Sequence, residues 1–270
     1  MATSIKQWND ARRRRRRAGA RARRKYADLR RKWLRRNRKL WLVAAAVCVI
    51  LWLVFDWLLD ALPGDHTWTS GAFAGALFAT LIAFRQSPPV SIASWEEGAY
   101  GEEETANQLR ILEKDGWVVL HDLANGSANF DHVVLGPTGV YCLNSKWSGY
   151  RLEESDEGRL VGRHRFDDDL YLNIDRNLRA VRGEAAALSK QIERRCGQRI
   201  WVQPVIVWWG DVANGGKLID GVGIVQGKNL AVRLRAQKGR PVPQFDRVVA
   251  VLRPGRHARG RQARTGAEAE

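Results

Sequence analysis

Residues 129–146 read NFDHVVLGPTGVYCLNSK, and this stretch decides the fold of the second half of the chain. Phe130 to Leu135 and Val140 to Trp147 are apolar-rich runs typical of β-strands. The tetrapeptide Gly136-Pro137-Thr138-Gly139 between them is a turn signal. Because the turn joins the two runs directly, the stretch predicts a β-hairpin.

Helical and strand-like segments surround this hairpin. Before it, residues 95–114 carry apolar side chains at helical spacing, and Gly116 follows their end. After it, apolar residues at intervals of three and four over residues 178–192 predict a second amphipathic helix. The remaining predicted elements are strands at 117–120, 201–209 and 222–225, an edge hairpin with a loop within 151–169, and a short helix at 230–234. This order predicts an α/β domain over residues 95–252, with a mixed central sheet flanked by helices.

The first third of the chain contains two long apolar runs. Every residue from Leu40 to Phe55 is apolar, and the run continues to Leu62, where Pro63-Gly64 ends it. At about 1.5 Å per residue, a helix over 40–62 is about 34 Å long, which exceeds a hydrocarbon core of about 30 Å. The second run covers residues 68–84, and a proline-containing linker follows over 87–94. The pair predicts a transmembrane helical hairpin rather than the buried hairpin of a soluble domain.

Polar and small residues give the predicted hairpin distinct faces. Asp56 and Asp60 share one helical face near the far end of the first helix, where they could reach the opposite interface or a partner helix. In the second helix, Gly71 and Gly75 form a small-residue face along which helices can approach closely. We expect this face to pack against the first helix; oligomerisation is the alternative.

Positive charge is concentrated in residues 1–39, which we call the basic arm. The basic arm holds 18 Lys and Arg against two Asp, and the remaining 27 basic and 27 acidic residues cancel, so it accounts for the whole net charge of +16. Basic residues are missing between Lys39 and Arg85, so the positive-inside rule predicts that both chain ends are cytoplasmic. The sequence thus predicts a multi-pass protein of the inner or plasma membrane.

The basic arm has several candidate roles. Its residues Arg12 to Lys39 could bind anionic lipid, at about 1 kcal/mol per basic residue near the surface, or nucleic acid through counterion release. Apolar residues among the basic ones over 26–40 indicate a helix lying on the membrane surface. A solvated, disordered topology signal is an equally good explanation. At the other end, residues 253–270 lack an apolar pattern and are predicted to be disordered.

Four residues around the 129–146 hairpin are candidates for a catalytic site. Asp131 lies early in the first strand, while Asn144 and Lys146 lie two apart in the second and so project from one face. Glu102 has a helical position that turns it toward the sheet. Carboxylates can hold a divalent cation that polarises a phosphodiester and acidifies a water molecule. A lysine can stabilise the charge that develops on the phosphate.

Each candidate also has a purely structural explanation. Asp131 could cap the turn, and Lys146 could be a surface residue lying over its tryptophan neighbour. His132 points to the opposite side of the strand from Asp131, so we expect it to pack and hydrogen-bond rather than catalyse. His121 and Asp122 are weaker candidates at the end of a strand. The three cysteines and five histidines show no spacing typical of a zinc site.

Together with Gly98-Ala99-Tyr100-Gly101-Glu102, the stretch from Asn129 to Lys146 resembles the nuclease-related domain (NERD) family, a branch of the PD-(D/E)xK restriction-endonuclease-like superfamily. The resemblance covers roughly residues 95–235. It implies a restriction-endonuclease-like fold and a metal-dependent nuclease site at Glu102, Asp131, Asn144 and Lys146. In such a site, Glu102, Asp131 and Asn144 would hold Mg²⁺ or Mn²⁺.

The sequence departs from the family pattern at two places. The family has Glu or Asp at position 144, and Asn144 offers only a neutral carbonyl oxygen there. Glu102 and Asp131 still supply the one or two carboxylates on which Mg²⁺ usually relies. The Asn-Pro and downstream Gln that many members carry at the start of the second long helix are also missing, with Asn177-Leu178 as the nearest match.

Two functions therefore remain open from the sequence. The first is metal-dependent hydrolysis of nucleic-acid phosphodiesters by a membrane-anchored nuclease-related domain with a degenerate motif. The alternative is a catalytically inactive, membrane-tethered scaffold that uses the basic arm to bind anionic lipid or nucleic acid. Asn144 distinguishes them, because an acid at this position would favour the enzyme.

Overall fold

The computed structural model describes residues 18–126, 128–155, 160–164, 167 and 170–253. The chain divides into two compact units. One unit comprises Met1–Arg21 with Glu97–Glu270, and the other comprises Ala22–Glu96.

A mixed sheet organises the larger unit. Within the described residues, six strands form this sheet in the order β1-β2-β3-β7-β9-β8. Their bounds are β1 Val118–Asn125, β2 Ala128–Gly136, β3 Gly139–Trp147, β7 Val202–Trp209, β8 Gly216–Ile219 and β9 Val222–Gln226. The predicted hairpin is β2 and β3, which pair antiparallel from Gly136↔Gly139 to His132↔Leu143. β3 pairs parallel with β7, and β7 parallel with β9, so the sheet is mixed as predicted.

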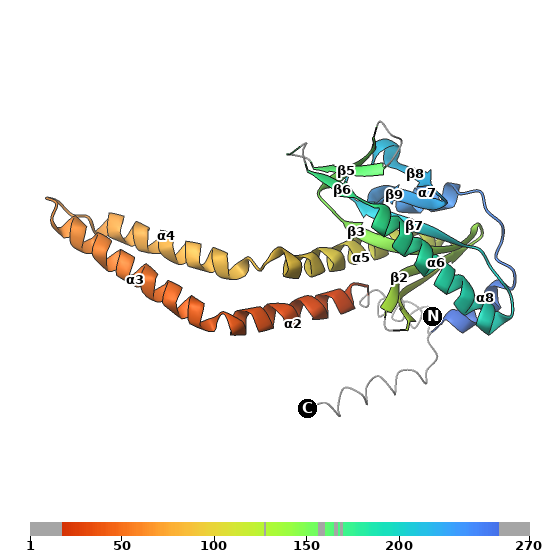
Figure 1. The fold of residues 1–270 in the computed structure, drawn as a ribbon, viewed down its shortest axis with the longest axis horizontal. Coiled ribbons are helices and arrows are strands. Elements are labelled where there is room, and N and C mark those ends of the chain that lie inside the picture. The colour runs from red at the N-terminus through yellow and green to blue at the C-terminus, as the bar shows by residue number, and fades with distance from the viewer. Residues whose placement is uncertain (1–17, 127, 156–159, 165–166, 168–169, 254–270) are drawn as a thin grey trace, which may run out of the picture. The chain divides into compact units, whose positions relative to one another are not determined.

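Helices cover both faces of the sheet. Helix α6 (Asp175–Cys196), which Figure 1 shows lying across the strands, packs with α8 (Phe245–Leu252) on one face, where Val133 and Cys142 meet Leu188. Helices α5 (Val90–Lys114) and α7 (Leu230–Ala236) share the other hydrophobic cluster, with Leu143 and Leu109. The predicted α/β fold with flanking helices is therefore confirmed.

The pleat of β3 assigns its polar residues to faces. Alternate residues of a strand point to opposite sides, and Cys142 lies in the α6 cluster whereas Leu143 lies in the α5 cluster. Asn144 therefore points toward α6, and Ser145 toward α5. Their contacts agree, because Asn144 hydrogen-bonds a residue of α6 and Ser145 Oγ donates to Thr105 Oγ1 of α5 at 2.8 Å.

Several predicted boundaries differ from the structure. Helix α5 begins at Val90 rather than at residue 95, so the predicted linker 87–94 shrinks to Ser87–Pro89. The reason is that proline is tolerated at a helix start, and Pro89 C=O accepts hydrogen bonds from the N–H groups of Ile92 and Ala93. Strand β1 runs to Asn125, five residues beyond its predicted end.

Other elements were not anticipated or lie outside the central sheet. The hairpin predicted within 151–169 exists as β4 (Tyr150–Glu154) and β5 (Leu160–His164), but it forms a separate three-stranded sheet with β6 (Tyr171–Asn173). Strand β8 and helix α8 were not predicted. Of the tail predicted to be disordered, residues 254–270 lie outside the described residues.

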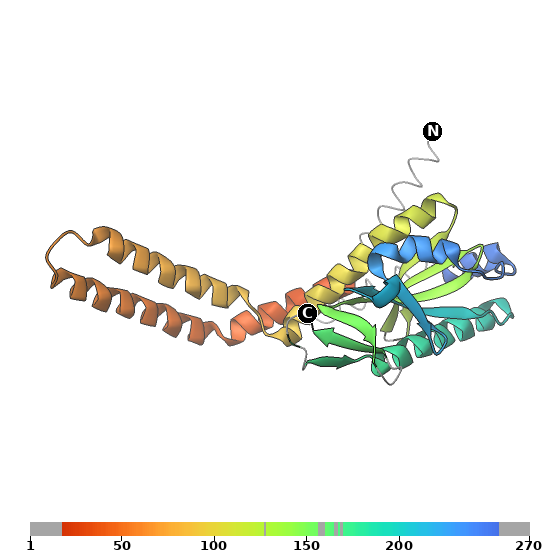
Figure 2. The same ribbon diagram turned by 90° about the horizontal axis from the view of Figure 1, so that it is seen from above.

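Two apolar helices form the core of the smaller unit. Helices α3 (Arg38–Asp60) and α4 (Thr67–Gln86) run side by side (Figure 2), close to the predicted spans 40–62 and 68–84. Each is long and apolar enough to cross a membrane, with mean hydropathy of 2.5 and 1.4 over its most apolar window. Only 0% and 6% of these windows are buried, which is unlike the core helix of a soluble protein. Ahead of them, the basic segment forms helix α2 (Ala20–Arg36); the run Arg12 to Arg17 lies outside the described residues.

A polar contact joins α3 to α4. Ser70 Oγ donates to Asp56 Oδ1 at 2.5 Å and accepts from Trp52 Nε1 at 3.0 Å, so Asp56 does reach a partner helix. The expectation that Gly71 and Gly75 pack against the first helix is wrong. A Cβ at either glycine would meet nothing within 4 Å, because α4 turns Ser70 toward α3 and its glycines away.

Candidate functional site

Glu102 lies in α5, and the pKa of its carboxyl group is strongly raised. Burial, followed by the charges of Asp131 and Asp122, raises the pKa of Glu102 to about 8. The N–H of Gly19 donates to Glu102 Oε2 at 2.9 Å and acts in the opposite direction, as does Lys146. The negative charge of this buried carboxylate needs stabilisation by nearby donors or cations, so the group is suited to binding a cationic ligand.

Gly19 can make this contact only as glycine. Its φ of +71° is in the left-handed region, and a Cβ would lie 2.7 Å from the carbonyl oxygen of Ala99. The backbone N–H therefore approaches Glu102 at a position with no room for a side chain on residue 19. This contact joins positions 83 residues apart and was not visible in the sequence.

Asp131 lies in β2, beside the β3 strand that carries the other candidates. Its Oδ2 accepts a hydrogen bond from Ser145 N–H at 3.1 Å, and within the described part of the chain no hydrogen bond to Oδ1 is found. Burial raises the pKa of Asp131, although the Lys146 charge and the Ser145 N–H lower it. The alternative that Asp131 merely caps the following turn fails, because its partner is in the neighbouring strand.

Asn144 is almost fully buried and is held by an acid that the sequence analysis missed. Its amide Nδ2 lies 3.2 Å from both Oε1 and Oε2 of Glu184, on α6. Burial, and then the charge of Asp131, raises the pKa of Glu184, while Asn144 and Lys146 lower it. Glu184 thus belongs to the same electrostatic cluster as Asp131 and Lys146.

Lys146 is the positive centre of this group. It lies two residues after Asn144 in β3, so both project to the α6 side. Its charge lowers the pKa of Glu102, Asp131 and Glu184 alike. Three carboxyl groups, from α5, β2 and α6, therefore lie close enough to one lysine to interact with it electrostatically.

Asp122 and His132 lie close to the candidate site residues in the sheet. Asp122, with φ of +52°, falls between the pairs His121↔His132 and Leu123↔Phe130 and so lies opposite Asp131. Its charge raises the pKa of both Glu102 and Asp131. His132 is fully buried, and its Nδ1 lies 2.7 Å from His121 Nδ1, so its predicted packing and hydrogen bonding are confirmed.

The donor chemistry of the cluster fits Mg²⁺ or Mn²⁺ better than zinc. Among the described residues, no three His, Cys, Asp or Glu side chains are arranged to hold a metal ion. Mg²⁺ needs no such cage, since it is usually held by one or two carboxylates and keeps several waters. Glu102 and Asp131 supply two hard oxygen donors, and because burial raises the pKa of both carboxyl groups, a bound cation would favour their ionised forms.

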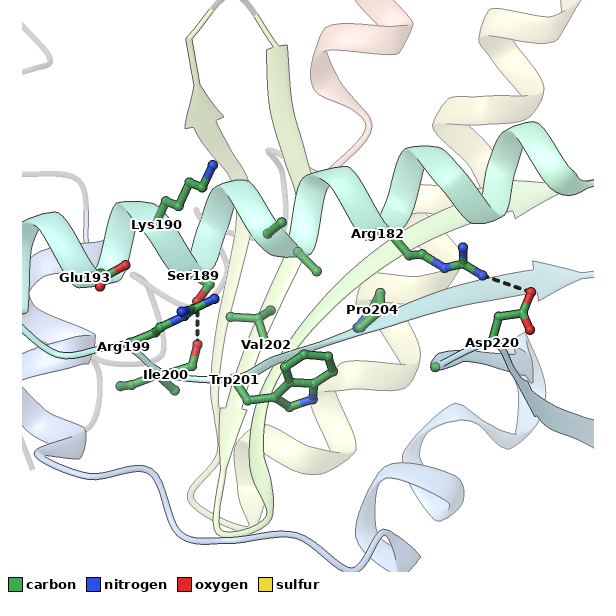
Figure 3. A pocket seen from close by; sticks show the side chains of 13 residues that line it. Arg182, Ser189, Lys190, Glu193, Arg199, Ile200, Trp201, Val202, Pro204 and Asp220 are labelled. Atoms are coloured by element: carbon green, nitrogen blue, oxygen red, sulfur yellow. Dashed lines mark hydrogen bonds and ion pairs between the residues drawn. The ribbon is translucent and has the colours of Figure 1, made fainter.

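A separate cavity lies at the start of β7. It measures about 730 Å³ and is bounded by one side of α6, by residues 199–204 and by Asp220-Gly221. In Figure 3, the Arg182 side chain extends toward Asp220, which it meets at 3.1 Å, and the Trp201 ring lies beside the strand. Glu102, Asp131, Asn144, Lys146 and Glu184 are not among the cavity's lining residues. The cavity is therefore separate from the acidic cluster, which consists of Glu102, Asp131 and Glu184 together with Asn144 and Lys146.

Comparison with known families finds a match to part of the larger unit. Residues 97–209 match the family described as Nuclease-related domain. These residues form a nuclease-related domain. The match to this domain begins at Glu97, within α5, and ends at Trp209, the last residue of β7. It therefore includes every residue of the acidic cluster. No curated protein and no solved structure matches the chain.

The candidates predicted from the sequence were Glu102, Asp131, Asn144 and Lys146, with Asp122 as a weaker one, whereas Glu184 and the Gly19 N–H were not predicted. Glu102, Asp131, Asn144 and Lys146 come together as expected from strand pairing and helical spacing. Glu184 could have been found from the 178–192 periodicity, because it lies among the small residues of that helix. The Gly19 N–H gave no comparable signal.

Proposed function

We propose that this chain is a membrane-anchored, metal-dependent nuclease that hydrolyses phosphodiester bonds of nucleic acid. The supporting observation is the convergence of Glu102, Asp131 and Lys146 within a nuclease-related domain. Two carboxylates and a lysine on adjacent elements are the residue types that phosphodiester hydrolysis needs.

Each residue has a defined task in this proposal. Glu102 and the Oδ1 atom of Asp131 would hold the cation, which when bound polarises the phosphodiester and acidifies a water molecule. Ser145 N–H fixes Asp131 through Oδ2, so that this carboxylate does not have to reorganise. Lys146 would contact a phosphate oxygen through Nζ and stabilise the negative charge that develops there.

The anchor in this proposal is the α3–α4 hairpin. Both helices have enough length and hydropathy to span a bilayer, and they expose their apolar side chains rather than burying them. With the basic arm before α3 and Arg85 near the end of α4, the positive-inside rule favours two cytoplasmic chain ends at an inner or plasma membrane. A reporter fused after Glu270 tests this orientation; extracytoplasmic signal would contradict it.

The activity test uses the full chain in lipid vesicles. DNA and RNA substrates are incubated with Mg²⁺ or Mn²⁺, alongside Lys146→Ala and Asp131→Ala. Lys190→Ala, on the exposed part of α6, is the matched control for loss of a lysine. We expect cleavage by the parent chain and by the control, and a loss of at least about 100-fold in the two site variants. Cleavage that persists in both site variants would refute the site assignment.

A non-catalytic scaffold is the second candidate, and Asn144 is the observation that favours it. A neutral side chain at this position weakens cation binding relative to an acid. The same vesicle experiment separates the two functions. If the parent chain binds anionic vesicles or nucleic acid through the basic arm but cleaves nothing with either metal, the scaffold is correct.

A further inference from the structure

The Asn144–Glu184 contact fixes the orientation of an amide in the candidate site. Nδ2 of Asn144 lies 3.2 Å from each carboxylate oxygen of Glu184. An ionised carboxylate only accepts hydrogen bonds, so it must face the NH₂ group of Asn144. The carbonyl oxygen Oδ1 of Asn144 consequently points away from Glu184. Glu184 therefore decides which end of the amide is presented to the rest of the site.

Glu184 also carries the charge that position 144 lacks. It is partly buried, and both of its carboxylate oxygens contact Asn144, which lies two residues before Lys146 in β3. Glu193, nine residues further along α6 and on its opposite side, is exposed. Glu184 is thus the acid of this helix that is placed to act on the site.

We propose that Asn144 and Glu184 together replace a single strand acid, Asn144 supplying the oxygen ligand and Glu184 the negative charge and the orientation of the amide. This inference rests on the proposed metal site. Glu184 is a positioning residue here, since it acts through Asn144.

Exchanging the amide and the carboxylate between positions 144 and 184 tests whether the two residues act as a pair. Restoring an acid at position 144 alone, with Asn144→Asp, removes the hydrogen-bond donor and places two carboxylates within hydrogen-bonding distance. Like charges this close repel strongly in a buried site. Adding Glu184→Gln returns one donor and one carboxylate, with their positions exchanged. A merely structural contact predicts no benefit to metal binding from this exchange.

The experiment measures Mn²⁺ binding to the full chain in detergent micelles by electron paramagnetic resonance of the free ion. The variants are Glu184→Gln, Asn144→Asp, the double variant of both, and Asp131→Asn. Glu193→Gln is the matched control, since it removes an exposed carboxylate from the same helix. Thermal unfolding without metal is recorded for each variant.

We expect Glu184→Gln to weaken Mn²⁺ binding by roughly 10- to 100-fold, the usual effect of losing a residue that orients a metal ligand. The double variant should recover most of this loss. In the absence of metal, Asn144→Asp should melt below both the parent chain and the double variant. Glu193→Gln should bind Mn²⁺ like the parent chain.

Three results would decide against the inference. The first is Mn²⁺ binding by Glu184→Gln that equals that of the parent chain, while Asp131→Asn loses binding. This result would support the proposed metal site but not the role of Glu184. The second is a double variant no better than Glu184→Gln. The third is a parent chain that binds no Mn²⁺, which rejects the metal site and this inference together. By contrast, Glu184-dependent binding without any cleavage would reject only the proposed hydrolysis.

Discussion

The raised pKa of Glu102 predicts an unusual dependence of stability on pH in the metal-free protein. The pKa rises from 4.5 in the unfolded reference to about 8 in the folded domain. Below pH 4.5 both states are protonated, and the full stability is present. As pH rises from 4.5 toward 8, the unfolded state releases its proton first, so the folded state is progressively destabilised.

The magnitude follows from the same shift. At about 1.36 kcal/mol per pKa unit, Glu102 alone accounts for a loss on the order of 5 kcal/mol across this range. For a domain of this size, each 1 kcal/mol corresponds to about 2–4 °C in Tm. The burial of Asp131 and Glu184 acts in the same direction.

Thermal unfolding of the full chain in detergent with a chelator, followed between pH 4.5 and 8, measures this effect. Tm should fall as pH rises, and Glu102→Gln should remove most of the slope and unfold at a higher temperature than the parent chain at pH 8. Mg²⁺ added at pH 8 should restore stability to the parent chain, since it binds the ionised folded state. A parent Tm that is constant or rises over this range, or an equal slope in Glu102→Gln, would refute the reasoning.

Three further predictions concern packing and reactivity. Gly136→Ala should lower the free energy of unfolding by at least about 2 kcal/mol, because the new Cβ would lie 2.1 Å from the Trp117 ring. The control is Gly183→Ala, whose Cβ meets nothing within 4 Å and which should be neutral or slightly stabilising. Denaturant unfolding measures both variants. Ser70→Ala should weaken the α3–α4 hairpin by about 1–2 kcal/mol by removing the contact to the α3 carboxylate, and steric-trap unfolding in bilayers that shows parent-like stability would contradict this. Burial, followed by the charges of Glu184 and Asp131, raises the pKa of the Cys142 thiol, so maleimide labelling followed by peptide mass spectrometry should find it unmodified at pH 8 until the domain unfolds.

Most of the secondary structure was predicted from local sequence patterns. The Gly136-to-Gly139 turn and the two apolar runs beside it were sufficient for the β2–β3 hairpin, because register and turn are set by neighbours in the chain. The same holds for α6, whose apolar residues repeat at helical spacing. Helix α8 was missed, although Val248, Val249 and Leu252 are buried in it, since an eight-residue helix offers too few repeats for a periodicity.

The proximity of the candidate residues could be predicted from the sequence where it depends on neighbouring strand positions. Asn144 and Lys146 share a face because they lie two apart in one strand, and strand pairing brings Asp131 beside them. Where the reasoning was wrong, at Gly71 and Gly75, composition indicated that helices can approach but not which helix does so. The side of α4 that faces α3 is set instead by Ser70 and its polar contact with Asp56.

The sequence by itself determined the two apolar helices, the sheet-forming hairpin and the residue types available for chemistry, because each depends on spacing along a few turns or one strand pair. Only the tertiary structure decided how charge is distributed over the site. The Glu184 carboxylate reaches Asn144 across 40 residues, and the Gly19 N–H reaches Glu102 across 83. Such contacts have no local signature, since they arise when helix α6 packs against strand β3 and when the segment before α2 packs against helix α5. For that reason a neutral asparagine that looked like a lost acid in the sequence has an acid beside it in the fold.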